Sequence, residues 1–388
     1  MKKKIKYAEF PDMNTVKDIV IFGGKKGADK PQYTFYNFDG EIEMKTFAQV
    51  NYDLTGLGQY LYKLGLRGKK VAILSENSYY WIACYFSIIT GKITAVPMDP
   101  KLPDDDIIDI MIRSGCNAIY YSEDFKDTVE KMKKTDGVVI EQYIKIEDFY
   151  SMVEEGHNEV KNGVESYLED EVLPSDLAFL VYTSGTTGKS KGVMLSQENV
   201  AADSVASCRV MTGGPAIGFL PLHHAFSWVG ALFSGNLLTE WGFICRSLKD
   251  IQKDMNTYHP QNFSAVPLAV ETIYKKIWFT AKKSGREEML KKGLKISNFL
   301  LKLGIDKRRK IFSEILNNLG GNLEMIVCGG AYLDEQYEKG MEAFGIKIIN
   351  GYGITECSPA VTCNRLDAYK VGSVGIPLPC NEIKIKDP

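Results

Sequence analysis

The sequence is poor in the residues that build metal centres. It has four histidines among 388 residues, and its eight cysteines include no C-x-x-C pair. Two of the histidines, His223 and His224, are adjacent, which is not a metal-ligand spacing, and no cysteine or carboxylate stands beside them. A zinc site of the usual kind is therefore excluded. The cysteines are expected to be thiols, because a chain of this length does not need disulfides in place of a core.

The chain also lacks a charge excess and a long hydrophobic run. Its net charge is −2, so no global basic field attracts nucleic acid. The longest uncharged apolar stretch runs from Tyr79 to Thr90, which is too short to span a bilayer. The basic start at residues 1–6 resembles the beginning of a signal peptide, but Glu9 and Asp12 interrupt any apolar region after it. We expect a soluble, cytoplasmic protein with no nucleic-acid partner.

Two common enzyme fingerprints are missing as well. No G-x-S-x-G elbow occurs, so Ser-His-Asp hydrolysis has no nucleophile to start from. The G-x-G pairs at residues 56–58 and 351–353 both lack the third glycine of a dinucleotide-binding turn. Neither a hydrolase of that class nor a Rossmann dehydrogenase is supported.

What the sequence does contain is an alternation of apolar strands and helices. Residues 71–74 and 93–97 are short apolar runs, and the aromatic segment between them reads as a helix capped by Asn77 or Ser78. A second alternating series begins at Leu177. Continuously apolar strands that alternate with helices are typical of a parallel sheet covered on both faces. The fold class predicted is therefore α/β.

The pattern also suggests how the chain is divided. Residues 150–175 are polar and acidic, which suits a surface connection. We therefore predict two sheet-bearing αβα halves, residues 1–175 and 176–388. Within the second, residues 282–310 carry eleven Lys or Arg against three acids, with Leu and Phe interleaved. This pattern predicts a basic helical insertion; a solvated helix surface is the plain interpretation, and peripheral membrane contact is the alternative.

The segment from Tyr182 to Gly192 is the most informative, and we call residues 183–191 the phosphate loop. An apolar strand leads into Thr-Ser-Gly-Thr-Thr-Gly-Lys-Ser-Lys. Glycines let successive N–H groups turn toward an anion, while hydroxyls and lysines add donors and charge, so a polyphosphate is the natural guest. A Walker A loop would need glycine at position 183, which is threonine, and a helix after the loop, where residues 192–196 read as a strand.

The amino-acid sequence of this loop resembles the signature of the adenylate-forming superfamily. That superfamily comprises acyl-CoA synthetases, luciferases and peptide-synthetase adenylation domains. Four more segments resemble that family's motifs in the expected order, and they lie at residues 220–226, 328–331, 350–356 and 372–377. The resemblance implies a large N-terminal domain of acyl-CoA synthetase type, with two αβα subdomains and a smaller β subdomain. Residues 1–175 contribute only a compatible alternation.

The resemblance also implies the roles of individual residues. The phosphates of ATP would be held by Thr183, Ser184, Gly185, Thr186, Thr187, Gly188, Lys189 and Lys191. Adenine and the acyl group would be bordered by Gly329, Gly330, Ala331, Asn350, Gly351, Tyr352 and Gly353, with the Tyr352 ring on adenine. Thr355 would contact the α-phosphate and Glu356 would bind Mg²⁺, which takes oxygen ligands. His224 would line the reacting carboxylate. Trp228, one helical turn later, would border the acyl group or pack in the core.

The implied reaction is attack of a carboxylate on ATP to give an acyl-adenylate, followed by displacement of AMP by coenzyme A. Amino-acid-activating relatives carry an Asp near the segment His223 to Trp228, which here has none, so a medium- or long-chain fatty acid is favoured. The family's ribose-binding Asp, hinge and C-terminal catalytic Lys are not found before Pro388. We therefore expect this chain alone to be a poorly active part of a ligase, lacking the C-terminal domain. The alternatives are a non-catalytic nucleotide- or acyl-binding protein, an enzyme for an aryl or other acid, and a P-loop ATPase.

Overall fold

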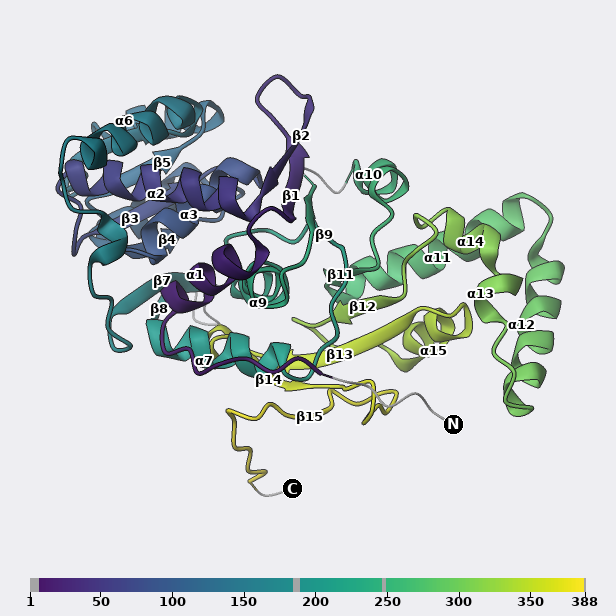
Figure 1. Cartoon of the computed structure of the whole chain (residues 1–388). Coiled ribbons are helices and arrows are strands. Elements are labelled where there is room, and N and C mark those ends of the chain that lie inside the picture. The colour runs from purple at the N-terminus through teal and green to yellow at the C-terminus, as the bar shows by residue number, and fades with distance from the viewer. Residues whose placement is uncertain (1–6, 184–188, 246–248, 387–388) are drawn as a thin grey trace.

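The computed structural model describes residues 7–183, 189–245 and 249–386. Within these residues the chain forms one six-stranded and one nine-stranded sheet with helices packed on both (Figure 1). The predicted α/β class is confirmed. No helix in these ranges combines the length and the hydropathy that a bilayer span requires.

The six-stranded sheet, which we call the first sheet, has the order β6-β5-β3-β4-β7-β8. Its strands are parallel except β8, which runs antiparallel to β7. The strands are β3 (Lys70–Leu74), β4 (Thr94–Pro97), β5 (Ala118–Tyr121), β6 (Gln142–Lys145), β7 (Leu177–Thr183) and β8 (Lys191–Ser196). Its helices are α2 (Phe47–Lys63), α3 (Tyr79–Ile89), α4 (Asp104–Ser114), α5 (Lys126–Met132), α6 (Phe149–Lys161) and α7 (Gln197–Cys208), with 3₁₀ turns η1 (Glu123–Phe125), η2 (Ile146–Asp148) and η3 (Tyr167–Glu169).

The nine-stranded sheet, the second sheet, has the order β15-β14-β13-β12-β11-β9-β10-β1-β2. Its strands are β1 (Pro31–Tyr36), β2 (Ile42–Thr46), β9 (Ala216–Gly218), β10 (Gly242–Ile244), β11 (Asn262–Ala265), β12 (Met325–Cys328), β13 (Lys347–Gly353), β14 (Ala360–Cys363) and β15 (Ile376–Pro377). The strands β13, β12, β11, β9, β10 and β1, which are neighbours in this order, are parallel. Strand β2 at one edge, and β14 and β15 at the other, are antiparallel. Around it lie α1 (Val16–Gly27), α8 (Ala225–Ser227), the π-helix η4 (Trp228–Phe233), α9 (Ser234–Leu238), α10 (Ile251–Tyr258), α11 (Pro267–Lys283), α12 (Glu287–Lys302), α13 (Arg308–Ile311), α14 (Ser313–Asn317), α15 (Glu335–Ala343) and the 3₁₀ turn η5 (Thr355–Cys357).

The two sheets exchange strands across the predicted boundary at residue 175. Strands β1 and β2 precede the boundary but belong to the second sheet, where β1 pairs with β10 and β2 with β1. Strands β7 and β8 follow the boundary but belong to the first sheet, where β7 pairs with β4 and β8 with β7. The sheets therefore do not divide the chain into residues 1–175 and 176–388. Strand pairing over such separations depends on tertiary contacts that a local pattern does not reveal.

Helix α3 is the centre of the shared core. All eleven of its residues are buried, which explains the uncharged run from Tyr79 to Thr90 without a membrane. Ser78 caps the helix, since its hydroxyl accepts from the N–H of Trp81. The helix packs against β3 and β4 of the first sheet and β1 of the second. It therefore fixes the two sheets relative to each other.

The prediction of a surface connection at residues 150–175 is wrong for most of that segment. Residues 149–161 form α6, which buries Met152, Val153 and Gly156 against α2. A Cβ added at Gly156 would lie 1.9 Å from the carbonyl oxygen of Gly56, so the helices touch through backbone. Tyr167 is also buried and bonds Thr90. The sequence prediction failed because the acids of α6 make the segment polar overall, although its apolar residues have helical spacing.

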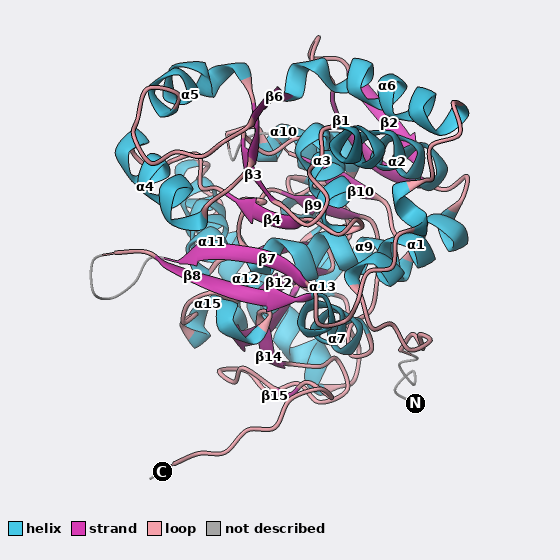
Figure 2. Ribbon diagram, turned by 90° about the vertical axis from the view of Figure 1, so that its left-hand side faces the viewer, coloured by secondary structure: helices cyan, strands magenta, loops and turns pink. Residues whose placement is uncertain are grey.

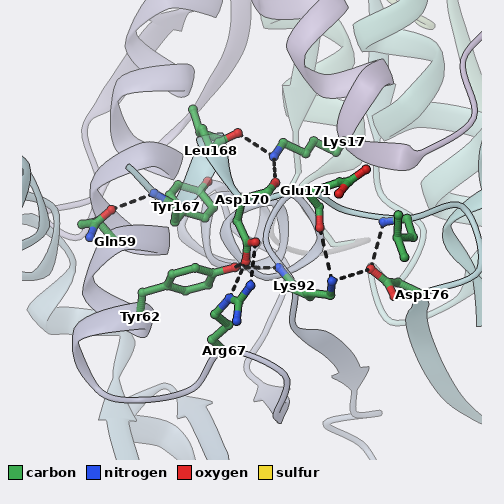
Figure 3. Close-up of polar contacts among 11 residues, drawn as sticks. Lys17, Gln59, Tyr62, Arg67, Lys92, Tyr167, Leu168, Asp170, Glu171 and Asp176 are labelled. Carbon is green, nitrogen blue, oxygen red and sulfur yellow. Dashed lines mark hydrogen bonds and ion pairs between the residues drawn. The ribbon is translucent and has the colours of Figure 1, made fainter. Parts of the chain in front are cut away.

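Asp170 connects this segment to α1, to α2 and to the turn between α2 and β3. Arg67 donates to both carboxylate oxygens at 2.6 and 2.8 Å, and the Tyr62 hydroxyl donates at 2.7 Å (Figure 3). Lys17 of α1 donates to the carbonyl of Asp170 at 2.6 Å. Arg67 lowers the pKa of the Asp170 carboxyl to about 2.

We expect Asp170→Asn to lower Tm by about 2–4 °C at pH 7, because the bidentate pair and the tyrosine bond are lost together. The depressed pKa means that the Asp170 carboxylate stabilises the fold above pH 4 and loses this effect as pH falls toward 2. The Tm difference between the two proteins should therefore shrink below pH 4. Asp105→Asn, which removes an exposed surface pair with Lys131, should leave Tm unchanged. A thermal scan at several pH values measures both; equal shifts in the two variants would contradict the prediction.

Candidate functional site

The candidate site lies where parallel strands of the second sheet end. Cα pairing aligns Ala265 of β11 with Cys328 of β12, and Cys328 with Asn350 of β13. The turns that follow these strands therefore emerge on the same edge of the sheet. In open α/β sheets, ligands bind in the crevice outside the carboxyl ends of the strands.

Three predicted motifs meet at this edge. A Cβ added at Gly329 would lie 3.5 Å from the Gly351 oxygen and 3.6 Å from the Phe226 ring. Gly330 has a φ of 85°, which a side chain would strain. The neighbouring Ala331 is exposed. The glycine turn, the segment that follows the histidines and the end of β13 therefore lie together at this edge.

The turn that carries His224 is fixed from the first sheet by Asn77. Its side-chain amide donates to the Leu220 carbonyl at 2.8 Å and accepts from the Leu222 N–H at 2.9 Å. The sequence suggested Asn77 only as a helix cap, a role that Ser78 fills. Asn77 therefore connects the two sheets at the candidate site.

Trp228 packs in the core, the second of the two roles that the sequence left open. It is fully buried, stacks on Phe179 at 4.7 Å, and donates its indole N–H to the Leu222 carbonyl at 2.7 Å. It is not among the side chains that line the cavity described below. Position 228, one helical turn after His224, lies on the buried face of η4 together with Val229, Leu232 and Phe233.

The two adjacent histidines have different surroundings. His224 borders the cavity, whereas His223 is buried with its Nε2 3.6 Å from an Asp99 oxygen. The fold therefore supplies His223 with a carboxylate that the local sequence lacks. Burial and the nearby His224 lower the pKa of His223 to about 4. Desolvation also lowers the pKa of His224, because protein surrounds the ring even though the cavity leaves it accessible.

Glu338 organises the start of the Tyr352 motif. This fully buried carboxylate accepts from the Asn350 amide at 2.9 Å, the Tyr369 hydroxyl at 2.6 Å and the Gly372 N–H at 3.0 Å. It joins two of the predicted motifs, residues 350–356 and 372–377. The Asn350 amide nitrogen is thus engaged inside the protein, and the residue's contribution is to hold the strand end. Sequence reasoning missed Glu338, because an acid on a polar helix resembles a solvated residue.

The rest of that motif is accessible. Tyr352 is 50% exposed, which leaves its ring free to stack on a base. Glu356 is exposed on η5, and Thr355 is half-buried. Asp203 of α7 accepts from the Ala360 N–H at 3.2 Å and so holds the returning strand. Burial raises the pKa of Asp203 to about 8.

The base of the phosphate loop lies near this motif. Thr183 and Lys191 are paired at the end of the β7–β8 hairpin (Figure 2), and β8 contacts η5, which carries Glu356. Lys189 and Lys191 are exposed. Arg113, which the sequence did not single out, donates to the Ser190 carbonyl and hydroxyl at 2.8 and 2.7 Å. Strand β8 follows the loop as predicted, which contradicts a Walker A arrangement. The remaining predicted loop residues, Ser184, Gly185, Thr186, Thr187 and Gly188, lie outside the described residues.

Glu356 fits one mode of magnesium binding. Among the described residues, no group of three or more His, Cys, Asp or Glu side chains could hold a metal. Mg²⁺ in nucleotide sites uses one or two carboxylates together with substrate phosphates rather than a protein cage. An exposed carboxylate on η5, which contacts the strand that follows the predicted phosphate loop, suits that mode.

A cavity of about 1030 Å³ opens beside His224. It lies between α10, α11, α12 and α14, and α11 lines it along one face from Leu268 to Ser284. That span corresponds to roughly 24 Å of helix. Apolar side chains such as Ile273, Ile277 and Ile315 form its walls. Helix α12 of the predicted insertion is therefore only partly solvated, because Leu290 and Gly293 face the cavity.

Known proteins resemble this chain in sequence. The AMP-binding enzyme family matches residues 24–388. Long-chain-fatty-acid–CoA ligase 6 of Mus musculus is 28% identical over 360 residues, which cover 86% of this chain and 52% of the ligase. Fatty acyl-CoA synthetase A of Dictyostelium discoideum is 25% identical over 384 residues, which cover 90% of this chain and 55% of the synthetase. This chain thus spans about half the length of these curated relatives.

Solved structures share the fold. The N-terminal domain of FACL13 from Mycobacterium tuberculosis has a TM-score of 0.73 at 16% identity, covering 94% of this chain and 82% of that chain. FadD1, a long-chain-fatty-acid–CoA ligase from Archaeoglobus fulgidus, has a TM-score of 0.74 at 16% identity, covering 97% and 72%. The anthranilate CoA ligase AuaEII in complex with anthranoyl-AMP has a TM-score of 0.73 at 18% identity, covering 97% and 66%. These identities establish the fold, and the family match over more than half of the chain establishes that this protein belongs to the AMP-binding enzymes.

Proposed function

We propose that this chain is the nucleotide- and acyl-binding part of an enzyme that uses ATP to activate a medium- or long-chain fatty acid. The product would be an acyl-adenylate, and coenzyme A would then displace AMP. The observation that carries the proposal is the apolar cavity that begins at His224, next to the edge where the predicted nucleotide-binding turns meet. A cavity whose lining is mainly apolar suits the tail of a fatty acid.

In this proposal the protein binds and orients the reactants. His224 would face the fatty acid carboxylate, and desolvation lowers the pKa of its imidazole, which favours the neutral form. Tyr352 would stack on adenine, and the donors of the phosphate loop would hold the phosphates. Lys189 and Lys191 would offset phosphate charge. Mg²⁺ held by Glu356 would neutralise charge on the phosphate oxygens.

The length of the cavity supports a long acyl chain over a small acid. One leaflet accounts for about half of a hydrocarbon core that is about 30 Å thick. The roughly 24 Å that α11 contributes is therefore long enough for the tail of a membrane fatty acid. An aryl acid is the second candidate, because the fold is shared with an anthranilate CoA ligase, but an aryl acid would leave most of this cavity unfilled.

Carboxylate-dependent exchange of pyrophosphate into ATP tests the proposal. The assay uses the full-length gene product and acids of two to eighteen carbons, together with anthranilate. We expect exchange to require a carboxylate and to rise with chain length, because each buried methylene contributes about 0.8 kcal/mol. ATP hydrolysis without any acid would indicate an ATPase. Nucleotide binding without exchange would indicate a non-catalytic protein, and preference for anthranilate would indicate an aryl substrate.

A further inference from the structure

Helices α11 and α12 expose large apolar side chains. Phe279 is 66% exposed, Phe299 62%, Leu303 59% and Ile296 56%. Helix α12 stands at the right-hand edge of the molecule in Figure 1, away from both sheets. Large exposed apolar side chains on two helices that contact each other indicate a contact with another body.

The exposed apolar residues of α12, together with Leu303 at its C-cap, form a stripe. Met289, Ile296, Phe299 and Leu303 are separated by seven, three and four residues, which places them on one face of the helix. Leu290 and Ser297, which are buried, lie on the inward face. The stripe therefore faces outward and makes no part of the core.

Lysines flank this stripe. Among the described residues, no carboxylate lies within 4.0 Å of the amines of Lys292, Lys295 and Lys302. Arg308 and Arg309, by contrast, donate to backbone carbonyls and are anchored to the fold. The segment 282–310 is strongly basic in a chain whose net charge is −2.

We propose that the α11–α12 surface docks on the surface of a membrane that contains anionic phospholipids. Apolar side chains would enter the boundary between headgroups and acyl chains, and flanking lysines would reach the phosphates. A second copy of this chain would complement the surface less well, since both copies would present the same basic face. Met289, the first residue of the stripe, also lines the cavity. The cavity thus reaches the docking surface, and the inference rests on the proposed function in that a bilayer would deliver the fatty acid there.

Sedimentation of the 388-residue chain with vesicles tests this surface. Vesicles of phosphatidylcholine alone are compared with vesicles containing one quarter phosphatidylglycerol, at low and high salt. We expect binding to the anionic vesicles that weakens with salt. The triple variant Lys292→Glu, Lys295→Glu and Lys302→Glu should lose at least tenfold in partitioning, and so should Phe279→Ser with Phe299→Ser. Neither set lines the cavity.

The matched control reverses three exposed lysines on other surfaces, Lys25, Lys134 and Lys161, and should keep vesicle binding. An equal loss in the control, or unchanged binding in both stripe variants, would overturn the proposal. A dimer that depends on Phe299, in a protein that does not bind vesicles, would also overturn the proposal, because a second copy of the chain would then be the partner. Binding of a water-soluble medium-chain acid without vesicles is measured in parallel. If the chain binds this acid but not vesicles, only the proposed docking surface is rejected. If the chain does not bind the acid, the proposed fatty-acid cavity is rejected.

Discussion

Replacement of Ala281 by Phe is expected to weaken binding of a sixteen-carbon fatty acid by more than a hundredfold while leaving an eight-carbon acid nearly unaffected. Ala281 lines the cavity near the end of α11, whereas His224 and Val266 border the opposite end. A carboxylate placed at His224 would direct only a long tail as far as Ala281. If the new ring displaces four methylenes, the loss is roughly 3 kcal/mol, at about 0.8 kcal/mol for each.

Titration with both acids, followed by calorimetry or displacement of a fluorescent fatty acid, measures this effect. Ala343→Phe adds the same volume to α15, away from the cavity, and should change neither affinity. The Tm of both variants is recorded, because overpacking a core can destabilise a protein by about 1–3 kcal/mol. An equal loss for the two acids in a folded Ala281→Phe protein would show that the tail does not follow α11.

The sequence predicted those parts of the fold that depend on local pattern. The apolar runs that became β3, β4 and β7 were recognisable because parallel strands are buried on both faces. Pro103 and the acids that follow it favour a helix start at α4, because carboxylates in the first turn complement the helix dipole. The pairing of β1 with β10 was not predictable, because it joins residues about 200 positions apart.

The candidate site shows the same division. Motifs identified His224, Tyr352 and Glu356 as residues to examine, because each lies in a run with few alternative explanations. The side chains that hold these segments were missed: Asn77 and Glu338 lie in other elements and act through backbone and buried contacts. The cavity was missed as well, because the stripe of α11 that lines it has the same spacing as an ordinary core-facing stripe.

Replacement of Glu356 by Gln is expected to reduce the magnesium-dependent part of ATP affinity by at least tenfold. Gln keeps the size of the side chain and one oxygen but removes the charge that a hard cation prefers. Loss of residues that only support metal ligands costs 10–100-fold in metal affinity, and loss of a ligand should cost no less. Calorimetric titration of ATP with Mg²⁺ and with a chelator separates this effect from a general loss of binding.

Glu198→Gln is the matched control, because this exposed carboxylate lies in the first turn of α7, after the end of β8 that is remote from the phosphate loop. It should bind Mg·ATP as the unaltered chain does. ATP affinity in chelator should be the same for all three proteins or higher in Glu356→Gln, since a carboxylate near phosphate repels it when no cation intervenes. Retention of the full magnesium dependence by Glu356→Gln would remove Glu356 from the metal site, and the proposed site would then need another carboxylate.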